Sequence, residues 1–526
     1  MKNAGTLQRF FDECTRLGLK PPVVDASVMA PASVITVQRS QWRELAQAAK
    51  NAAMRWCGFW AQERDAGFEA FSCLETAGGY LIVRSRFNAD ETLPSLASVY
   101  PAADRPERHA RDLLGLQLED QPDDRRWTRH QAWDKTVYPL RADFQGKPPD
   151  KPTPPDHDYP FITGQGAGVV EIPVGPVHAG IIEPGHFRFQ AIGEIVLNLE
   201  ERLAYKHKGI EKLSVGRDAV STARLAGRVS GDSTVSHAWA ACQAMERAIG
   251  MEVPPRALWL RAIMAERERI ANHMGDVGAI CNDVGFGFGY YQLMRLKEQY
   301  LRMNMEVFGH RLMMDCIVPG GTAADIPAGA VRKLRDTVKP LFAEVAGIVA
   351  TLEDSESLED RLMGTGRLIP EYAAALGAVG YVGRASGQPF DVRRDAPYAP
   401  YDRLEVAVPA YRAGDVAARA RVRTDEIRIS LQLIAGLLDS LPGGSHRLEW
   451  PAPTGEREGI GFIEGWRGEI ITYVRFDDGG RVARFFPRDP SWLIWPALEL
   501  LIQDNIVPDF PVCNKSVNGS YSGVDL

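Results

Sequence analysis

The sequence has no two cysteines close enough to form a Cys-x-x-Cys motif. Its cysteines are seven isolated residues: Cys14, Cys57, Cys73, Cys242, Cys281, Cys316 and Cys513. This spacing argues against a zinc ribbon, a cluster-binding knot or a redox dithiol. Because isolated cysteines are commonly buried, we expect most of them to be small core residues. An iron–sulfur centre would then have to lie in another polypeptide.

Long apolar runs and a basic charge balance are also missing. No stretch of eighteen consecutive apolar residues is present that could span a bilayer. The formal net charge of −7 and the pI near 5.9 give no basic footprint for nucleic acid. The first residues lack the apolar core of a signal peptide, so we expect a cytoplasmic protein that contacts a membrane only through partners.

Common catalytic and nucleotide-binding motifs are absent as well. There is no phosphate loop, no Gly-x-Ser-x-Gly elbow and no His-Glu-x-x-His. The run Gly285-Phe-Gly-Phe-Gly289 follows no predicted strand, and no acidic residue stands at the distance that a dinucleotide site requires. We therefore reject a Rossmann interpretation.

The 526 residues, with 45% hydrophobic content, suffice for two or three domains. Five prolines within residues 147–158 exclude helix and sheet and predict an extended linker. We expect one domain over residues 1–146 and another over residues 159–526. In the first, the patterns predict a strand at 33–37, a helix at 41–53 and a hairpin of strands 68–74 and 80–87, which together make a small α+β domain.

Charged motifs follow in the same domain. They are Glu107-Arg-His-Ala-Arg-Asp112, Asp123-Asp-Arg-Arg126 and Pro139-Leu-Arg141. Their order resembles the signature of the thirty-kilodalton subunit of respiratory complex I. The resemblance implies a domain without a cofactor that docks neighbouring subunits. The implied docking residues are Glu107, Arg108, Asp112, Arg125, Arg126 and Arg141. The alternative is a solvated charged surface.

The second domain is predicted to be mainly helical. Residues 175–188 read as a strand with a tight loop and residues 191–199 as a second strand, which predicts a hairpin. Helices are predicted at 235–249, 256–278, 290–314, 328–352 and 423–441. The charged run from Glu266 to Arg269 fits a solvated face, but Glu268, Arg269 and His273 also resemble a Glu-Arg-x-x-x-His stretch of a redox-enzyme large subunit. We weigh these two interpretations equally, because buried charges would have to be paired.

Two segments have the outline of a dinuclear metal site. Gly227-Arg-Val-Ser-Gly-Asp-Ser-Thr-Val-Ser-His237 resembles the nickel-iron hydrogenase signature Arg-Val-Cys-Gly-Ile-Cys-x-x-x-His. The run from Asp509 to Leu526 resembles that family's closing Asp-Pro-Cys-x-x-Cys. The resemblance puts Ser230, Ser233, Ser520 and Gly523 at the four thiolate positions. Further segments from residue 205 to residue 469 resemble, in order, the large subunit of formate hydrogenlyase-type hydrogenases, so the likeness covers almost the whole chain.

The chemistry of these four residues excludes a nickel-iron centre. Nickel and low-spin iron are held by soft thiolates, whereas a serine hydroxyl is a hard donor and glycine offers none. Ser230, Ser233, Ser520 and Asp232 could present oxygens to magnesium, but neutral hydroxyls without clustered carboxylates make a weak cage. We therefore predict no metal site and no hydrogenase activity.

Quinone reduction is the second interpretation, since complex I resembles this family and uses the corresponding cavity for quinone. Its quinone-binding histidine and tyrosine correspond here to Ile182 and Gly231. A site without these donors would bind the quinone ring weakly or in another pose. The candidate cavity residues are His178, Glu183, His186, Arg228, Asp232, His237 and Tyr521. For any one histidine alone, a structural role is the more frequent outcome.

The predicted fold class is α+β: a small α/β docking domain, then a large, mainly helical bundle with an amino-terminal β-hairpin region, similar to a hydrogenase large subunit. The resemblance implies a metal-free subunit of a membrane-associated, redox-driven, ion-translocating complex. It would bind an iron–sulfur subunit and membrane subunits. It would carry no cofactor of its own, although quinone is a possible ligand. It would lie on the cytoplasmic face of the inner membrane. A quinone-reducing enzyme and a non-catalytic scaffold are the alternatives.

Overall fold

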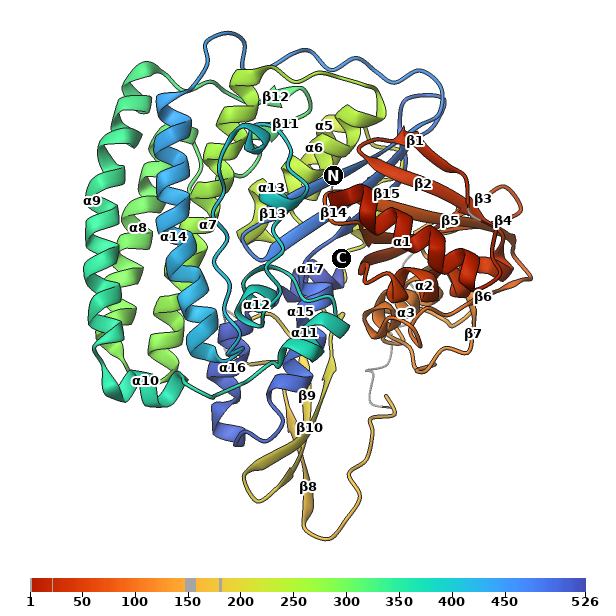
Figure 1. The fold of residues 1–526 in the computed structure, drawn as a ribbon, viewed down its shortest axis with the longest axis horizontal. Coiled ribbons are helices and arrows are strands. Elements are labelled where there is room, and N and C mark those ends of the chain that lie inside the picture. Colours follow the sequence, from red (N-terminus) through yellow and green to blue (C-terminus); the bar gives the residue numbers. More distant parts are fainter. Residues whose placement is uncertain (1, 21, 147–157, 179–181) are drawn as a thin grey trace.

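The computed structural model describes residues 2–20, 22–146, 158–178 and 182–526. The predicted linker at 147–158 therefore lies, apart from Asp158, outside the described residues. Figure 1 shows a helical bundle on one side, a β-sheet domain on the other, and a narrow sheet that projects below them. The fold class is α+β, as predicted.

The amino-terminal region is a five-stranded sheet of order β1-β2-β5-β4-β3 with helices on one face (Figure 1). Its strands are β1 (Val24–Met29), β2 (Ala32–Val37), β3 (Arg55–Arg64), β4 (Gly67–Glu75) and β5 (Tyr80–Asn88). Its helices are α1 (Lys2–Arg16), α2 (Trp42–Asn51) and α3 (Asp104–Leu114), with η1 (Arg39–Gln41), η2 (Pro101–Ala103) and the short parallel pair β6 (Thr92–Pro94) and β7 (Gln117–Glu119). The predicted strand, helix and hairpin correspond to β2, α2 and the antiparallel pair β4–β5. Strands β1, β3, β6 and β7 and helices α1 and α3 were not predicted.

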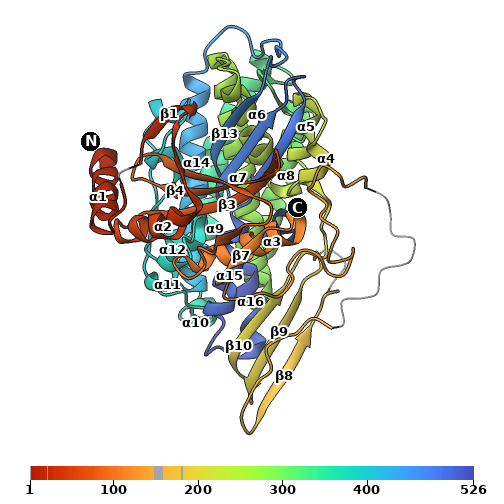
Figure 2. The same ribbon diagram turned by 90° about the vertical axis from the view of Figure 1, so that its right-hand side faces the viewer.

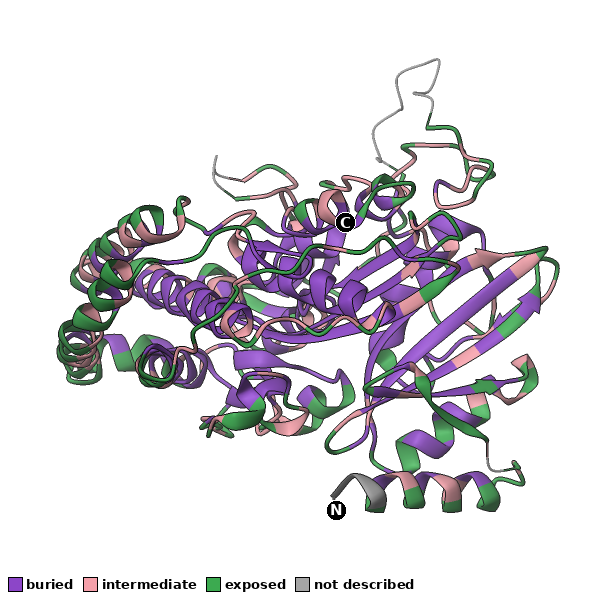
Figure 3. Ribbon diagram, turned by 90° about the horizontal axis from the view of Figure 1, so that it is seen from above, coloured by how far each residue is buried: buried purple, intermediate pink, exposed green. Residues whose placement is uncertain are grey.

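Four long helices form the bundle. They are α7 (Pro255–Asp283), α8 (Gly287–Phe308), α9 (Ala328–Glu353) and α14 (Val416–Asp439). A fifth helix, α6 (Thr234–Ala248), lies between the bundle and a carboxy-terminal sheet. All five were predicted, with ends displaced by up to seven residues. Figure 3 shows buried residues concentrated inside the bundle and sheets, and α9 on the outside exposes most of its residues.

A second sheet joins the two halves of the chain. It consists of β13 (Arg457–Gly465), β14 (Gly468–Phe476) and β15 (Val482–Arg488), and the sequence patterns did not predict it. Helix α6 packs closely on β13. The close approach is possible because Gly461 has no side chain: a Cβ atom there would lie 2.2 Å from the carbonyl oxygen of Ala240. On the other face, Tyr80 of β5 stacks on Phe462 with ring centroids 3.8 Å apart. The amino-terminal sheet thus shares a core with β13–β15.

The third sheet projects away from this body (Figure 2). It has the order β10-β9-β8, with β8 (Val169–Val174), β9 (His186–Ile192) and β10 (Ile195–Arg202). The predicted hairpin exists, but its second strand was placed wrongly: the turn falls at Gly193, in the left-handed region with φ +59°, inside the predicted strand 191–199. Glycine adopts that conformation without steric cost.

Short elements complete the fold. They are α4 (Ile210–Ser214), α5 (Ala219–Ala226), η3 (Gly231–Ser233), β11 (Ile317–Val318), β12 (Gly321–Thr322), α10 (Glu356–Leu362), α11 (Pro370–Ala375), α12 (Gly380–Ala385), α13 (Val392–Asp395), η4 (Tyr401–Arg403), α15 (Ser491–Leu501), η5 (Val507–Asp509), α16 (Phe510–Val517) and α17 (Tyr521–Asp525). None of the helices in the described ranges combines the length and apolar composition needed to cross a bilayer.

Candidate functional site

Two serines distant in sequence meet in a hydrogen bond. The Oγ atoms of Ser230 and Ser520 lie 2.8 Å apart, although 290 residues separate them. Ser230 directly precedes η3, and Ser520 caps α17, where its Oγ accepts the backbone N–H of Gly523 at 2.9 Å. Three of the four predicted thiolate positions are therefore linked by direct hydrogen bonds.

The fourth position, Ser233, is linked to the other three through the carboxylate of Asp232. Asp232 Oδ1 accepts from Ser230 Oγ at 2.7 Å and from Ser233 Oγ at 3.3 Å. Arg467, in the tight turn between β13 and β14, donates to both oxygens of Asp232 at 2.7 Å. Burial raises the pKa of Asp232, but the charge and hydrogen bonds of Arg467 outweigh it, and the net effect is a lowered pKa. This carboxylate is therefore ionised and paired near neutral pH.

Three of these residues, Ser230, Asp232 and Ser520, line a polar pocket of about 360 Å³. Its wall also contains Ile182 and Gly231, which stand at the positions predicted for quinone-binding donors. The other lining residues are Glu183, Arg467, Asn514, Lys515, Asn518, Gly519, Tyr521 and Ser522. Such a volume is at the lower end of the range for small-molecule sites.

Behind the pocket, a buried carboxylate stands beside Gly523. A Cβ atom at Gly523 would lie 2.6 Å from Cγ of Asp489. Asp489 Oδ2 lies 2.8 Å from Nε2 of His237, and both side chains are fully buried. Burial raises the pKa of Asp489, whereas the hydrogen bond and charge of His237 lower it, to about 2. Asp489 thus occupies the space that a side chain at position 523 would need.

The predicted cavity residues divide into two groups. Glu183, Asp232 and Tyr521 line the pocket, whereas His237 is not a lining residue and contacts the buried Asp489. His178 Nε2 instead contacts the carbonyl oxygen of Gly185 at 2.8 Å, and His186 Nδ1 that of Gly175 at 3.2 Å. These two histidines do not line this pocket, because both contact backbone carbonyls at the base of the projecting sheet, and a role for them in a cavity stays a prediction.

Arg228 is also outside the pocket. Its guanidinium makes a bidentate ion pair with Asp315, with both distances 2.8 Å. Conversely, the predicted list lacks Arg467 and Asp489. Arg467 lies in the segment 464–469, whose likeness to the large subunit was a usable signal, whereas no sequence pattern marked Asp489.

The charged run of α7 is buried. Glu266, Arg267, Glu268 and Arg269 are at most 5% exposed, so the solvated-face interpretation is wrong. Glu268 accepts from the backbone N–H groups of Val235 and Ser236, at 2.7 and 3.1 Å, and thereby caps the start of α6 next to the pocket. Burial raises the pKa of Glu268 to about 8. His273 contacts Glu426 at 2.7 Å.

The predicted docking residues make their contacts inside the chain. Glu107 accepts from Ser95 Oγ at 2.6 Å, and Asp112 accepts from the backbone N–H of Trp127 at 2.6 Å. Glu107, Arg108 and Asp112 are buried in this chain, which leaves their side chains little surface for a neighbouring protein, and their docking role stays a prediction.

The remaining three docking residues are partly buried. Arg125 pairs with Asp123 and with Glu200 of β10, Arg126 pairs with Asp158, and Arg141 donates to the carbonyl oxygen of Leu114. Arg125 thus connects the amino-terminal region to the projecting sheet of the same chain. Whether these three also contact a partner stays a prediction.

The donors around the four positions do not fit a nickel-iron core. They offer two hydrogen-bonded hydroxyls, a third hydroxyl beside a paired carboxylate, and a backbone N–H at Gly523. None is a thiolate, which is the donor that this soft bimetallic centre requires. In the part of the chain that the structure describes, no three side chains of His, Cys, Asp or Glu are arranged to hold a metal ion.

Comparisons with known proteins agree with this architecture. Residues 35–150 match the family of the respiratory-chain NADH dehydrogenase 30 Kd subunit, residues 208–275 that of nickel-dependent hydrogenases, and residues 283–457 that of the NADH dehydrogenase 49 Kd subunit. Formate hydrogenlyase subunit 5 of Escherichia coli is 33% identical over 85% of this chain and 79% of its own length. The chain belongs to this family of hydrogenase and complex I subunits.

Other members of the family are similarly related. The membrane-bound hydrogenase subunit alpha of Pyrococcus furiosus is 30% identical over 68% of this chain and 87% of its own. An NADH-quinone oxidoreductase subunit of Phocaeicola vulgatus is 30% identical over 73% of this chain and 77% of its own. A chain in the structure of the membrane-bound sulfane sulfur reductase, an archaeal respiratory membrane complex, aligns with a TM-score of 0.64 and 26% identity over 68% of this chain and 99% of that chain.

Proposed function

We propose that this protein is a metal-free, hydrogenase-like subunit of a membrane-associated complex that couples electron transfer to ion translocation. It would bind an iron–sulfur subunit and membrane subunits and would itself carry no cofactor. Its relatives bear the names of formate hydrogenlyase, membrane-bound hydrogenase and NADH-quinone oxidoreductase subunits, which supports a place in such a complex. We place it peripherally on the cytoplasmic face, attached through its partners.

One observation supports the metal-free assignment above the others. The Ser230 and Ser520 hydroxyls hydrogen-bond to each other at 2.8 Å, and Asp489 stands where a side chain at position 523 would project. A bimetallic core needs four soft donors around an open space. Here the donors are hard and the space near Gly523 is taken.

A quinone-reducing function is the second candidate, because the polar pocket is large enough for a small ring and includes the Tyr521 side chain. Against it, Ile182 and Gly231 provide no side-chain donor. We therefore expect that any substrate reduced in this pocket is a polar molecule smaller than a quinone. A scaffold without any pocket chemistry is the third candidate.

Purification of a complex through a tag on this chain tests the proposal. We expect an iron–sulfur subunit and integral membrane subunits in stoichiometric amounts, with iron but no nickel. Isolation of the chain alone from solubilised membranes and cytosol would contradict it. The pocket variant Asp232→Asn and the control Asp315→Asn, whose partner Arg228 lies outside the pocket, separate the candidates. Pocket chemistry predicts that only Asp232→Asn lowers donor oxidation, whereas a scaffold predicts no change in either variant.

A further inference from the structure

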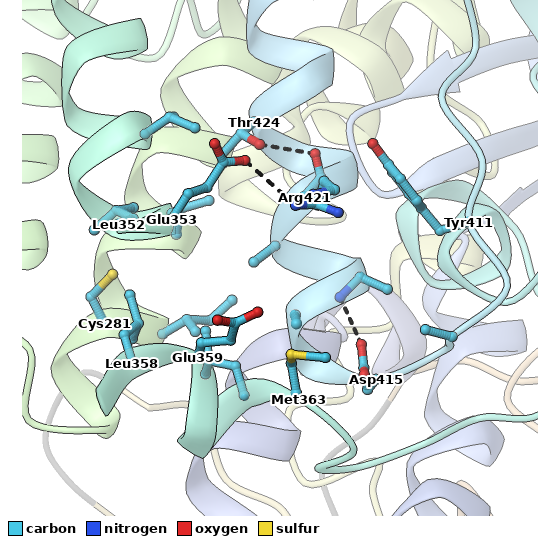
Figure 4. Close-up of a pocket in the computed structure, with 18 of the residues that line it drawn as sticks. Cys281, Leu352, Glu353, Leu358, Glu359, Met363, Tyr411, Asp415, Arg421 and Thr424 are labelled. Atoms are coloured by element: carbon cyan, nitrogen blue, oxygen red, sulfur yellow. Dashed lines mark hydrogen bonds and ion pairs between the residues drawn. The ribbon is translucent and has the colours of Figure 1, made fainter. Parts of the chain in front are cut away.

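A second pocket, whose described lining shares no residue with the serine pocket, lies between helices of the bundle (Figure 4). It is formed by α7, α9, α10, the segment 411–415 and the first turns of α14, and its volume is about 300 Å³. The floor consists of buried apolar side chains: Val277, Ile280, Cys281, Leu358 and Leu362. No residue of the serine site contributes to it.

The pocket exists because part of its wall, contributed by one helix, consists of small side chains. Helix α14 contributes Ala417, Ala418 and Ala420, so nothing fills the space toward Leu352 of α9 and Leu358 of α10. Apolar space of this size is costly to leave empty, because the lining atoms lose dispersion contacts. A pocket open to the outside and lined in this way is suited to an apolar ligand.

The polar groups of the lining are already satisfied within the chain. Tyr411 donates to Asp425 at 2.6 Å, and Thr424 donates to the carbonyl oxygen of Arg421 at 2.9 Å. Asp415 caps α14 through the N–H of Ala418 at 2.8 Å and also accepts from Gly364 at 2.9 Å. The hydroxyl donors of Tyr411 and Thr424 are therefore already engaged, and Asp415 already accepts two bonds, so the interior favours an apolar ligand over a polar one.

Apart from the buried helix cap Asp415, the charged residues of the described lining are exposed and stand at the mouth. Arg421 and Glu353 lie 3.7 Å apart with more than half of each side chain exposed, and Arg412 and Glu359 are further lining residues. Such an exposed pair is weak and can rearrange around a head group. The distribution of an apolar interior and a charged mouth matches an amphiphile with one hydrocarbon chain.

We propose that this pocket binds the hydrocarbon chain of an amphiphilic molecule such as a fatty acid, with the head group at Arg412 and Arg421. At roughly 30 Å³ for a methylene-sized group, the volume accommodates on the order of ten carbons. This proposal is independent of the proposed function, since the serine pocket and the bundle pocket share no residue.

Calorimetric titration of the detergent-free, full-length chain with decanoate, below its micelle concentration, tests the proposal. We expect saturable one-to-one binding, weaker by about fourfold for each methylene removed. The filled variant Ala417→Leu/Ala420→Leu should lose at least about tenfold in affinity. The control Ala343→Leu, on the exposed side of α9, should bind like the wild type.

Absence of saturable binding to the wild type would overturn the proposal, and so would equal binding to the filled variant. Circular dichroism and thermal melting establish that each variant is folded. If the double variant does not fold, Ala420→Val replaces it and should weaken decanoate binding severalfold; unchanged affinity would again contradict the site. A higher melting temperature of the filled variant together with no binding to the wild type would identify a simple packing void.

Discussion

At the scale of single residues, the serine site differs from a metal site by what fills it. Gly523 has no side chain, and the carboxylate of Asp489 packs directly against its Cα. The resemblance predicted which four positions would converge, because it rested on spaced motifs. It could not predict Asp489, because the contact is made between separate segments of the folded chain.

Gly523→Ala tests this packing. The added methyl group would meet the Asp489 carboxylate at 2.6 Å, so we expect a loss of about 1–3 kcal/mol in the free energy of unfolding. Gly231→Ala is the matched control, because its Cβ would point into open space and should cost less than about 1 kcal/mol. Urea denaturation measures both. Equal costs for the two variants would show that Asp489 does not crowd Gly523.

Glu268 provides a prediction about pH. Its folded pKa of about 8 lies above the unfolded value, so protonated Glu268 favours folding at low pH, and this stability is lost as the pH rises through about 8. Glu268→Gln cannot ionise and should remove the dependence. As the pH rises from about 5.5 to about 9, we expect the free energy of unfolding of the wild type to fall by on the order of 2–5 kcal/mol more than that of the variant. Parallel pH profiles in denaturant titrations would contradict the assignment.

At the scale of elements, periodicity predicted the helices well and their environment poorly. Helix α7 was predicted, but a run of four charged residues looks the same in sequence whether it faces water or a set of buried partners. Those partners come from distant segments: Glu266 accepts from Arg393 at 2.9 Å and from Ser430 at 2.6 Å. The sheet β13–β15 was missed for a related reason, since its strands are buried on both faces and show no alternation of polar and apolar residues.

Glu266→Ala tests the buried network. Removal of this carboxylate deprives the buried Arg393 of one of its ion-pair partners, so we expect the free energy of unfolding to fall by about 3–5 kcal/mol. Glu298→Ala on α8 is the control, because Glu298 also pairs with two arginines but its side chain is 39% exposed, so its removal should lower the free energy of unfolding far less. Chemical denaturation monitored by tryptophan fluorescence distinguishes the two. A small cost for Glu266→Ala would mean that the network adds little to stability.

At the scale of the whole molecule, the amino-terminal region does not stand apart. Its sheet stacks on β13–β15, and Arg105 of α3 pairs with Glu201 of β10 at 2.9 Å and with Glu499 of α15 at 2.8 Å. Arg105, like Arg125 of the charged motifs through Glu200, therefore connects the amino-terminal region to the rest of the same chain. Sequence could indicate that these charges needed partners, but it could not indicate that the partners lay in the same polypeptide.

Nickel content of the complex purified through this chain, from cells supplied with nickel, bears most directly on the metal-free assignment. A hydrogenase with cysteines at the four positions, purified in the same way, serves as the positive control. We expect fewer than about 0.05 nickel atoms per chain, because hydroxyls do not replace the thiolates. About one nickel per chain, together with hydrogen uptake, would contradict the metal-free assignment.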